Sequence, residues 1–254
     1  MSRLNLVLAL MVALLFVGLL RFPVSVCAAG DGRVVSHSGY RDSDGNYHVV
    51  GEVENFGDVA VNYVRVTATF YDSSNFVIDS RFDLTMIYVI LSGRKAPFDV
   101  ALLDVAESAL VDHYELSVTF LEASPLPMGL EIVSQSSSVD AMDQMHVTGE
   151  LRNGGSLNLT NGKVVATFYG QASKVVAAAY TFLDPELIGE ITPNQTVPFE
   201  IALSAERTGH VSTFALTAES SQYAAIPEYA PLTLVALFSI GSGIAFFALR
   251  RRRP

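Results

Sequence analysis

The stretch that decides the fold is HVVGEVENFGDVAVNYVRVTATFYD, residues 48–72. It returns 98 residues later as HVTGELRNGGSLNLTNGKVVATFYG, residues 146–170. Farther on the offset becomes 101, where GRKAPFDVAL (93–102) matches NQTVPFEIAL (194–203). Self-similarity at a fixed spacing is the signature of a repeated structural unit. The chain therefore contains one module of about 90 residues twice.

Each module has the alternating pattern of β-strands. In residues 64–71 the apolar Val64, Val66, Ala68 and Phe70 alternate with polar neighbours, and residues 98–102 and 114–120 repeat the pattern. A period of two with one apolar face is typical of half-buried antiparallel strands. In residues 47–54 the same rule points Tyr47, Val49, Gly51 and Val53 inward, and it points His48, Val50, Glu52 and Glu54 outward.

This strand map makes a specific prediction about ion pairs. Glu52 and Arg65 both face outward, and the second copy supplies Glu150 and Lys163 at the same places. We therefore expect each carboxylate to lie beside its basic counterpart on a neighbouring strand, as a surface pair worth less than about 1 kcal/mol.

The turns agree with strands. Asp44-Gly45 lies in DSDGNY (42–47), a strong hairpin signal. Gly93 of the first copy is replaced by Asn194 in the second, which indicates a left-handed backbone there. Short strands separated by turns predict an all-β fold with two tandem immunoglobulin-like antiparallel β-sandwiches. The proline-containing LEASPLPMG, residues 121–129, is the expected linker.

The module resembles a known family. ATFYD (68–72) after VVGEVENFGDVAVNYVRV, followed by LSGRKAPFDV, is similar to the FxLYD domain of exported archaeal and bacterial proteins. The resemblance implies a small β-sandwich and no particular activity. The tail IPEYAPLTLVALFSIGSGIAFFALRRRR resembles the PEF-type C-terminal sorting signal of archaeal surface proteins. It implies a sorting motif at Pro227, Glu228 and Tyr229 and processing by an archaeosortase-like enzyme; a plain membrane anchor is the alternative.

The two ends of the chain predict export. Arg3, an uncharged run over residues 4–20 and small residues at 28–29 describe a signal peptide over residues 1–28. An uncleaved anchor, or lipidation of Cys27, is the alternative. Residues 230–249 carry no charge over roughly one bilayer crossing, which predicts a transmembrane helix. Arg250, Arg251, Arg252 and Arg253 follow as a membrane stop, so the C-terminus is expected in the cytoplasm and the modules outside.

The charge of the exported part excludes one class of partner. All 26 acidic residues lie between Asp31 and Glu228, with 10 of the 16 basic ones, so this part carries a formal charge of −16. A nucleic acid would require compensating Lys and Arg side chains. The sole cysteine, Cys27, lies in the predicted signal, so stability is expected to come from packing without disulfides.

Residues that could carry chemistry each have a simpler interpretation. His48 and His146 recur in both copies, but without a second His or Cys at ligand spacing they are expected to be cross-strand histidines. DSDGN (42–46) lacks the closing glutamate of a calcium loop and is expected to be a hairpin. We predict no catalytic, cofactor-binding or metal residues. Asn158 and Asn194 begin sequons in loops and are possible glycosylation sites.

These observations divide the chain into seven parts. They are a signal peptide (1–28), a first sandwich (31–120), a linker (121–129), a second sandwich (130–221), a stalk (222–229), a membrane or sorting helix (230–249) and a basic tail (250–254). We predict a non-catalytic cell-surface protein, membrane-anchored or sortase-processed, with binding or structural roles toward an extracellular protein or glycan. An accessory extracellular subunit of a transporter or surface enzyme complex is the alternative. An enzyme would require a polar pocket between the units, lined by tyrosine and carboxylates from both.

Overall fold

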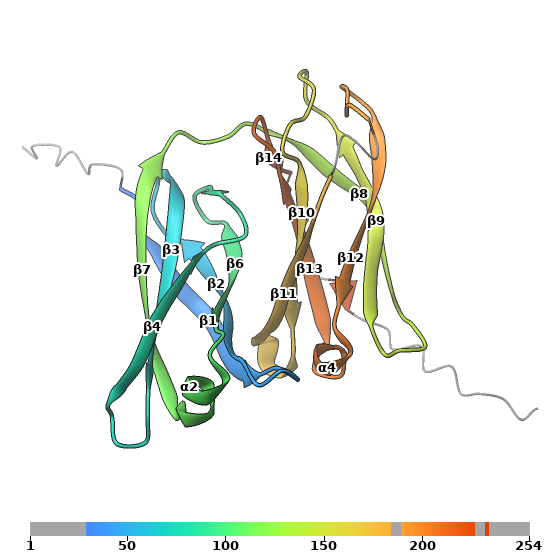
Figure 1. Ribbon diagram of the computed structural model, residues 1–254. Helices are drawn as coiled ribbons and strands as arrows, with labels where there is room; N and C mark the ends of the chain where they lie inside the picture. The colour runs from blue at the N-terminus through green and yellow to red at the C-terminus, as the bar shows by residue number, and fades with distance from the viewer. Residues whose placement is uncertain (1–28, 184–188, 227–231, 234–254) are drawn as a thin grey trace, which may run out of the picture.

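The computed structural model describes residues 29–183, 189–226 and 232–233, which are almost entirely β-structure (Figure 1). The first unit consists of seven strands and one short helix: β1 (Gly32–Arg41), β2 (Tyr47–Asn55), β3 (Ala60–Tyr71), β4 (Val77–Leu84), β5 (Val89–Ile90), β6 (Lys95–Leu102), α2 (Val105–Leu110) and β7 (His113–Ala123). Strands β1, β2 and β6 form one sheet, and β4, β3, β5 and β7 form the other.

The second unit repeats this plan. It consists of β8 (Met128–Val139), β9 (Met145–Asn153), β10 (Lys163–Tyr169), the 3-10 turn η1 (Gln171–Ser173), β11 (Val175–Phe182), β12 (Thr196–Leu203), α4 (Ala205–Thr208), β13 (Thr213–Glu219), β14 (Ala224–Ala225) and β15 (Leu232–Thr233). The β8-β9-β12 layer corresponds to β1-β2-β6, and β11-β10-β13 corresponds to β4-β3-β7. Because β14 pairs with both β13 and β8, the two layers join at one edge into a partly closed barrel.

The inward faces of the strands lie where the sequence predicts them. Val64, Val66, Ala68 and Phe70 are buried, and they pack with Phe98, Val100 and Leu102 in the first core. The residues at 114, 116, 118 and 120 cover this core from β7. The second core contains Val147, Leu151, Phe168, Phe199 and Ile201 from the corresponding strands. The all-β, sandwich-like character of both units is therefore shown.

The two units are stacked, which makes four successive layers of sheet from left to right in Figure 1. The outer face of β1-β2-β6 meets the outer face of β11-β10-β13, and β11 contacts β1, β2 and β6. The expectation that Val50 and Glu52 point into solvent is therefore wrong, since both are buried. Strand β7 continues to Ala123 and β8 begins at Met128, so four residues connect the units.

The predicted ion pairs are also wrong. Glu52 lies on β2 and Arg65 on β3, and these strands belong to different layers of the sandwich. Arg65 instead covers the ring of Phe82, with its guanidinium carbon 3.4 Å from the ring centroid. In the second unit Lys163 pairs with Glu219 on the adjacent strand β13, at 2.9 Å, and not with Glu150. Alternation identified the faces of these strands but not which strands are neighbours.

The predicted turns are confirmed. Gly93 has a φ of +69° and Asn194 a φ of +65°, so both copies use a left-handed residue at this turn. The backbone of 42–46 closes the β1–β2 hairpin, with Gly45 at a φ of +91°. The short helices α2 and α4 were not predicted from the alternating pattern. A local signal for α2 was present, because Asp104 caps the helix by accepting a hydrogen bond from the Glu107 N–H at 2.9 Å.

Two predicted membrane-related segments lie mostly outside the described residues. These are residues 1–28 and most of 230–249, together with the sorting motif 227–229 and the arginines 250–253. Within 230–249 the structure describes Leu232–Thr233, which are extended and pair with β13, whereas the sequence predicts helix for these two residues. Among the described residues, none of the helices has the length and apolar character needed to cross a bilayer.

A buried asparagine fastens the same end of each sandwich. Asn55 is fully buried, and its amide nitrogen donates to the carbonyl oxygens of Val59 and Ile90, at 2.8 and 3.0 Å. Its side-chain oxygen accepts from the Gly57 N–H at 3.0 Å. Asn153 makes the corresponding bonds to Leu157, Ile191 and Gly155. Each amide thus links the turn that follows its own strand to a second segment of the chain, at Ile90 in the first unit and at Ile191 in the second.

We predict that Asn55→Ala and Asn153→Ala each lower the free energy of unfolding by about 1–3 kcal/mol, because buried backbone groups lose their partners. Urea denaturation of both variants would measure this. Asn158→Ala, at an exposed asparagine in the second unit, is the control and should change stability by less than about 0.5 kcal/mol. Equal effects for all three substitutions would contradict a special role for the buried amides.

Candidate functional site

The contact between the two sandwiches is organised around one buried carboxylate. Glu52 on β2 is 2% exposed, and its two oxygens have different partners. Lys95 of the adjacent strand β6 donates to Oε1 at 2.8 Å, and the Tyr169 hydroxyl of the second unit donates to Oε2 at 2.8 Å. Burial, followed by the charge of Glu52, raises the pKa of Tyr169, so this phenol stays protonated and remains a donor. Both oxygens of a desolvated carboxylate are thereby satisfied.

Further polar contacts surround this centre. The Ser36 hydroxyl accepts from the Val175 N–H at 2.9 Å, and the Ser38 hydroxyl donates to the Val175 carbonyl at 2.6 Å. At one end Arg207 of α4 lies over the Tyr40 ring at 3.8 Å. At the other end the Glu219 carboxylate accepts from the Tyr88 and Val89 N–H groups. Because these contacts lie on both sides of Glu52, they fix the orientation of one sandwich against the other.

A cavity of about 270 Å³, which we call the junction cavity, lies between the units. It is lined by side chains that include Glu52, Lys95, Tyr169 and Glu219. It thus has the position and the residue types that an enzyme site at this place would require. Its carboxylates are already engaged, however, because Glu52 binds Lys95 and Tyr169, and Glu219 binds Lys163 and two backbone N–H groups. These contacts favour a role in packing.

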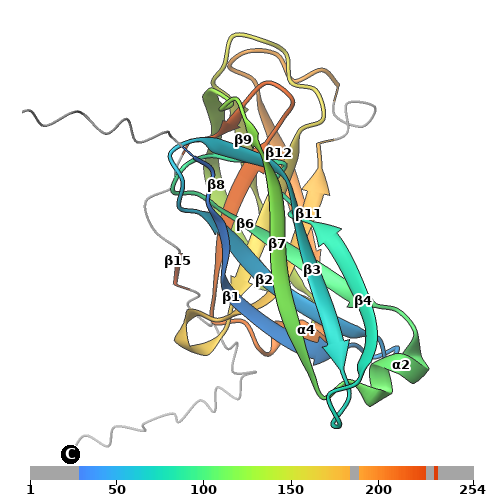
Figure 2. The same cartoon turned by 90° about the vertical axis from the view of Figure 1, so that its left-hand side faces the viewer.

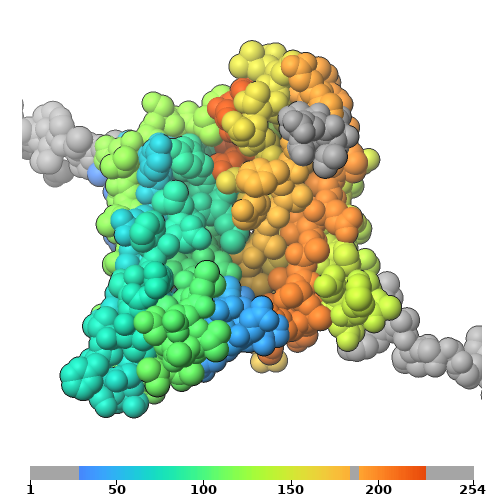
Figure 3. Space-filling model, in the orientation of Figure 1, coloured from blue at the N-terminus to red at the C-terminus, as the bar shows by residue number. Residues whose placement is uncertain are grey.

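A more open groove of about 450 Å³ lies beside it, and we call it the junction groove. Its lining combines aromatic residues from both units with polar ones: Tyr88, Val89, Leu126, Asn161, Lys163, Phe182, Glu219, Ser220 and Ser221. Tyr88 and Phe182 are exposed, and Tyr63 lies against Tyr88 with the ring centroids 4.8 Å apart. Figure 3 shows the two units meeting along the middle of the molecule. Exposed aromatic rings beside polar groups are typical of binding sites.

Tyr63 has an unusual backbone conformation for its residue type. Its φ is +47°, and Asn161, which occupies the corresponding position in the second unit, has a φ of +52°. Asn tolerates this left-handed region, whereas a bulky aromatic residue there is strained. Tyr63 nevertheless keeps an exposed ring at the edge of the junction groove. Strain of this kind clusters at functional sites, so Tyr63 is a candidate binding residue that periodicity did not identify.

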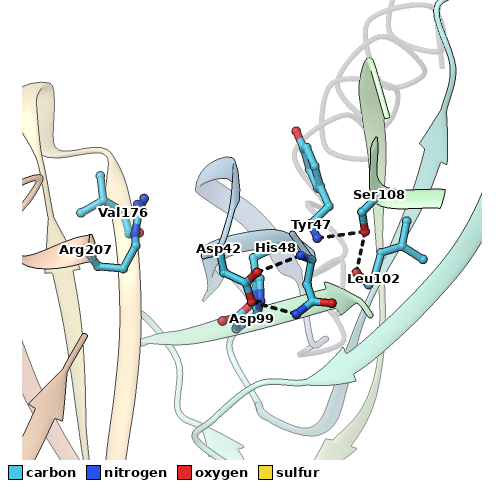
Figure 4. Close-up of polar contacts among 9 residues, drawn as sticks. Asp42, Tyr47, His48, Asp99, Leu102, Ser108, Val176 and Arg207 are labelled. Carbon is cyan, nitrogen blue, oxygen red and sulfur yellow. Dashed lines mark hydrogen bonds and ion pairs between the residues drawn. The ribbon is translucent and has the colours of Figure 1, made fainter. Parts of the chain in front are cut away.

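The two recurring histidines lie in matching polar clusters, as the cross-strand interpretation expects. His48 Nδ1 is 2.9 Å from Asp99 and its Nε2 is 3.3 Å from Asp42, as drawn in Figure 4. His146 lies between Glu200 and Asp140 at 2.6 and 3.3 Å. In the part of the chain that the structure describes, no group of three or more His, Cys, Asp or Glu side chains is arranged to hold a metal ion.

The structure does not bring the other predicted site residues together. Asn158 and Asn194 are both exposed in loops of the second unit, where a glycan could be attached. Pro227, Glu228, Tyr229 and Arg250 to Arg253 lie outside the described residues.

The interface itself was not predicted, although differences between the copies mark two of its buried apolar residues. Val50 and Val165 are buried at the junction, and their counterparts on the open faces are Thr148 and Thr67.

Comparisons with known proteins add no family. No family model matches the chain, and no curated protein matches it, so the FxLYD and sorting-signal resemblances stay predictions. Among solved structures, red sea bream transglutaminase aligns at 11% identity and a TM-score of 0.26, over 75% of this chain and 30% of its own. The exo-chitosanase CsxA of Amycolatopsis orientalis aligns at 13% identity and a TM-score of 0.28, over 78% and 26%. The chain thus spans about a quarter to a third of these structures.

We predict that Glu52 and Tyr169 are energetically coupled. Glu52→Gln and Tyr169→Phe should each destabilise the chain, and a double-mutant cycle by urea denaturation should give a coupling energy of about 1–2 kcal/mol. The repeat provides a matched control, since Glu150→Gln and Tyr71→Phe change the corresponding residues on open faces. In dilute solution each of these two control substitutions should change the free energy of unfolding by less than about 0.5 kcal/mol. Equal effects at both places would contradict the interface.

Stability should depend on pH through the two histidine clusters. Hydrogen bonds to Asp99 and to Glu200 raise the pKa values of His48 and His146. Hydrogen bonds, from Asn46 and from the Gln144 N–H, lower the pKa values of Asp42 and Asp140. A histidine whose pKa is raised by folding stabilises the folded state fully below about pH 6.5. This stabilisation is lost as the pH rises through the pKa of the histidine in the folded state. An aspartate whose pKa is lowered by folding stabilises the folded state fully above about pH 3.9. This stabilisation is lost as the pH falls through the pKa of the aspartate in the folded state.

Burial lowers the pKa of His37, which acts in the opposite direction, but the pKa values of two histidines are raised against this one. We therefore expect the free energy of unfolding to be highest between about pH 4 and pH 6.5 and to decline above that window. His48→Gln and His146→Gln should flatten the decline on the alkaline side. His210→Gln, at an exposed histidine, is the control and should leave the profile unchanged. Urea titrations at several pH values measure the profile, and a flat wild-type curve would contradict the assignment.

Proposed function

We propose that the chain is a non-catalytic cell-surface protein, membrane-anchored or sortase-processed, whose two immunoglobulin-like sandwiches form one rigid unit with a glycan-binding groove at their junction. The observation that supports this most directly is the junction groove, where exposed Tyr88 and Phe182 lie beside polar side chains and Tyr63 packs against Tyr88. A sugar ring offers apolar C–H faces to aromatic rings and hydroxyl groups to polar side chains. Asn161 and Ser221 line this groove, where the Asn161 amide donates to the Ser221 hydroxyl at 2.9 Å. The amide keeps a second N–H and the hydroxyl keeps its own proton for a ligand.

The sequence supports the location. A signal-like start, an acidic exported part and an apolar segment ending in four arginines are consistent with modules held outside a membrane. The Glu52 contacts support a structural contribution, because a fixed angle between two sandwiches holds aromatic groups from both units in one arrangement. The groove then needs little reorganisation when it binds a ligand, which lowers the entropic cost of binding.

Tyr63→Asn and Phe182→Ala should each weaken glycan binding, and Tyr63→Asn should also stabilise the fold by about 1 kcal/mol, because Asn suits the left-handed conformation. The measurement is binding of the purified full-length chain to a glycan array, with Phe76→Ala, an exposed aromatic change in the β3–β4 turn, as the control. No binding to any glycan, or equal loss with Phe76→Ala, would refute the groove assignment.

Location is tested separately in the native host. External protease should remove the modules from intact cells, and mass spectrometry of the C-terminal peptide should reveal either retention of the arginines or an end near residue 228. A chain recovered intact from the cytosol would refute the proposed location.

A further inference from the structure

The two sandwiches do not pack through equivalent faces. The first unit contributes its β1-β2-β6 face, whereas the second contributes β11-β10-β13, whose counterpart in the first unit is β4-β3-β7. Each unit therefore leaves open the face that corresponds to the one used by the other unit. The first unit exposes β4-β3-β7, which faces the viewer in Figure 2, and the second exposes β8-β9-β12 at the opposite end of the stack. A head-to-tail contact of this kind can be continued by further copies.

The groups that form the internal contact recur on the two open faces. Ser36, Ser38 and Glu52 correspond to Ser134, Ser136 and Glu150, which the repeat places on β8 and β9. The bulge before Ser36 on β1 also recurs before Ser134 on β8, so the side chains have the same spacing. On the other open face Tyr71 corresponds to Tyr169, and Val77 corresponds to Val175, whose backbone binds both serines of the first unit.

Burial differs between the equivalent positions in the way that a missing partner would produce. Val175 is 0% exposed under the first unit, whereas Val77 is 59% exposed. Phe82 and Leu84 on β4 do not add to this difference, because their counterparts Tyr180 and Phe182 stay exposed beside the internal contact. At the other end Ser134, Ser136 and Glu150 line a shallow depression of about 720 Å³. The change in burial between Val175 and Val77 is therefore the observation that indicates a missing partner.

We propose that a second copy of this chain continues the stack, with the β8-β9-β12 face of one copy against the β4-β3-β7 face of the next. In this contact Ser134 and Ser136 bind the backbone at Val77, and the Tyr71 hydroxyl, which donates to Glu115 at 3.2 Å within the chain, donates to Glu150 instead. The occupant is assigned from the internal contact, because another copy of the same module presents the face that the internal contact uses. The expected product is an open, head-to-tail series of chains.

The differences between the copies make this contact weaker than the internal one. Thr196 stands where the internal contact has Lys95, so Glu150 lacks the lysine that Glu52 has. Thr148 and Thr67 replace the buried Val50 and Val165. The arginine at 207 also has a glutamate, Glu107, as its counterpart in α2. We therefore expect reversible association that depends on concentration, and a lysine at 196 should strengthen it.

The test uses two differently tagged full-length chains produced together, one with Val77→Cys and the other with Ser134→Cys. Both positions are exposed, so the substitutions leave the core intact, and Val77→Cys keeps the backbone groups of the contact. Ser134→Cys removes one serine hydroxyl of the contact, but Ser136 keeps the other. A short bis-maleimide linker should join the two tags, and adding Thr196→Lys to the Ser134→Cys chain should raise the yield by about tenfold at limiting concentration. Tyr71→Phe in the Val77→Cys chain should lower the yield severalfold.

The controls measure background joining and symmetric joining. Val77→Cys with Thr192→Cys, an exposed loop position, gives the background, as does a chain with its native Cys27 alone. Stronger joining of two Val77→Cys chains, or of two Ser134→Cys chains, would mean a symmetric dimer and would overturn the head-to-tail arrangement. Joining at background level with and without Thr196→Lys would also overturn it. Tyr63→Asn, which tests the groove, should leave the yield unchanged, so the two proposals can fail independently.

Discussion

The structure depends on one packing event, the burial of the outer face of β2 beneath β10 and β11. Glu52 lies at the centre of this face, and its position is acceptable only because Lys95 and Tyr169 satisfy both of its oxygens. A buried carboxylate without such partners would cost several kcal/mol. The contact is therefore specific to one orientation of the second sandwich. Contacts made by Ser36, Ser38 and Arg207 between the two units stabilise the same orientation.

This orientation gives the molecule its candidate sites. The junction groove contains Tyr88 from a loop of the first unit and Phe182 from β11 of the second, and neither sandwich alone could form it. The same non-equivalent packing leaves the two end faces of the stack open, with Val77 at one end and Glu150 at the other. Ligand binding at the junction and self-association at the ends are thus two consequences of one asymmetric contact.

Comparison of the two copies shows two kinds of identical residue. Asn55 and Asn153 are identical, fully buried and bonded to matching backbone groups, so they belong to the fold of each unit. Glu52 and Tyr169 are also repeated, but they join the units, and their counterparts lie on the open faces. Val50 differs from its counterpart at the buried junction, as Thr148 shows, so this difference reports on the surroundings of each copy.

The sequence by itself determined the duplication, the strands with their inward faces, the β1–β2 hairpin and the left-handed turn shared by Gly93 and Asn194. These features follow from local rules, since side chains alternate along a strand and few residues accept a positive φ. Only the tertiary structure decided that Glu52 is buried, that Arg65 is not its partner, and that Tyr63, Tyr88 and Phe182 lie near one another. Alternation states which way a side chain points, but it contains no information about which sheet covers that face.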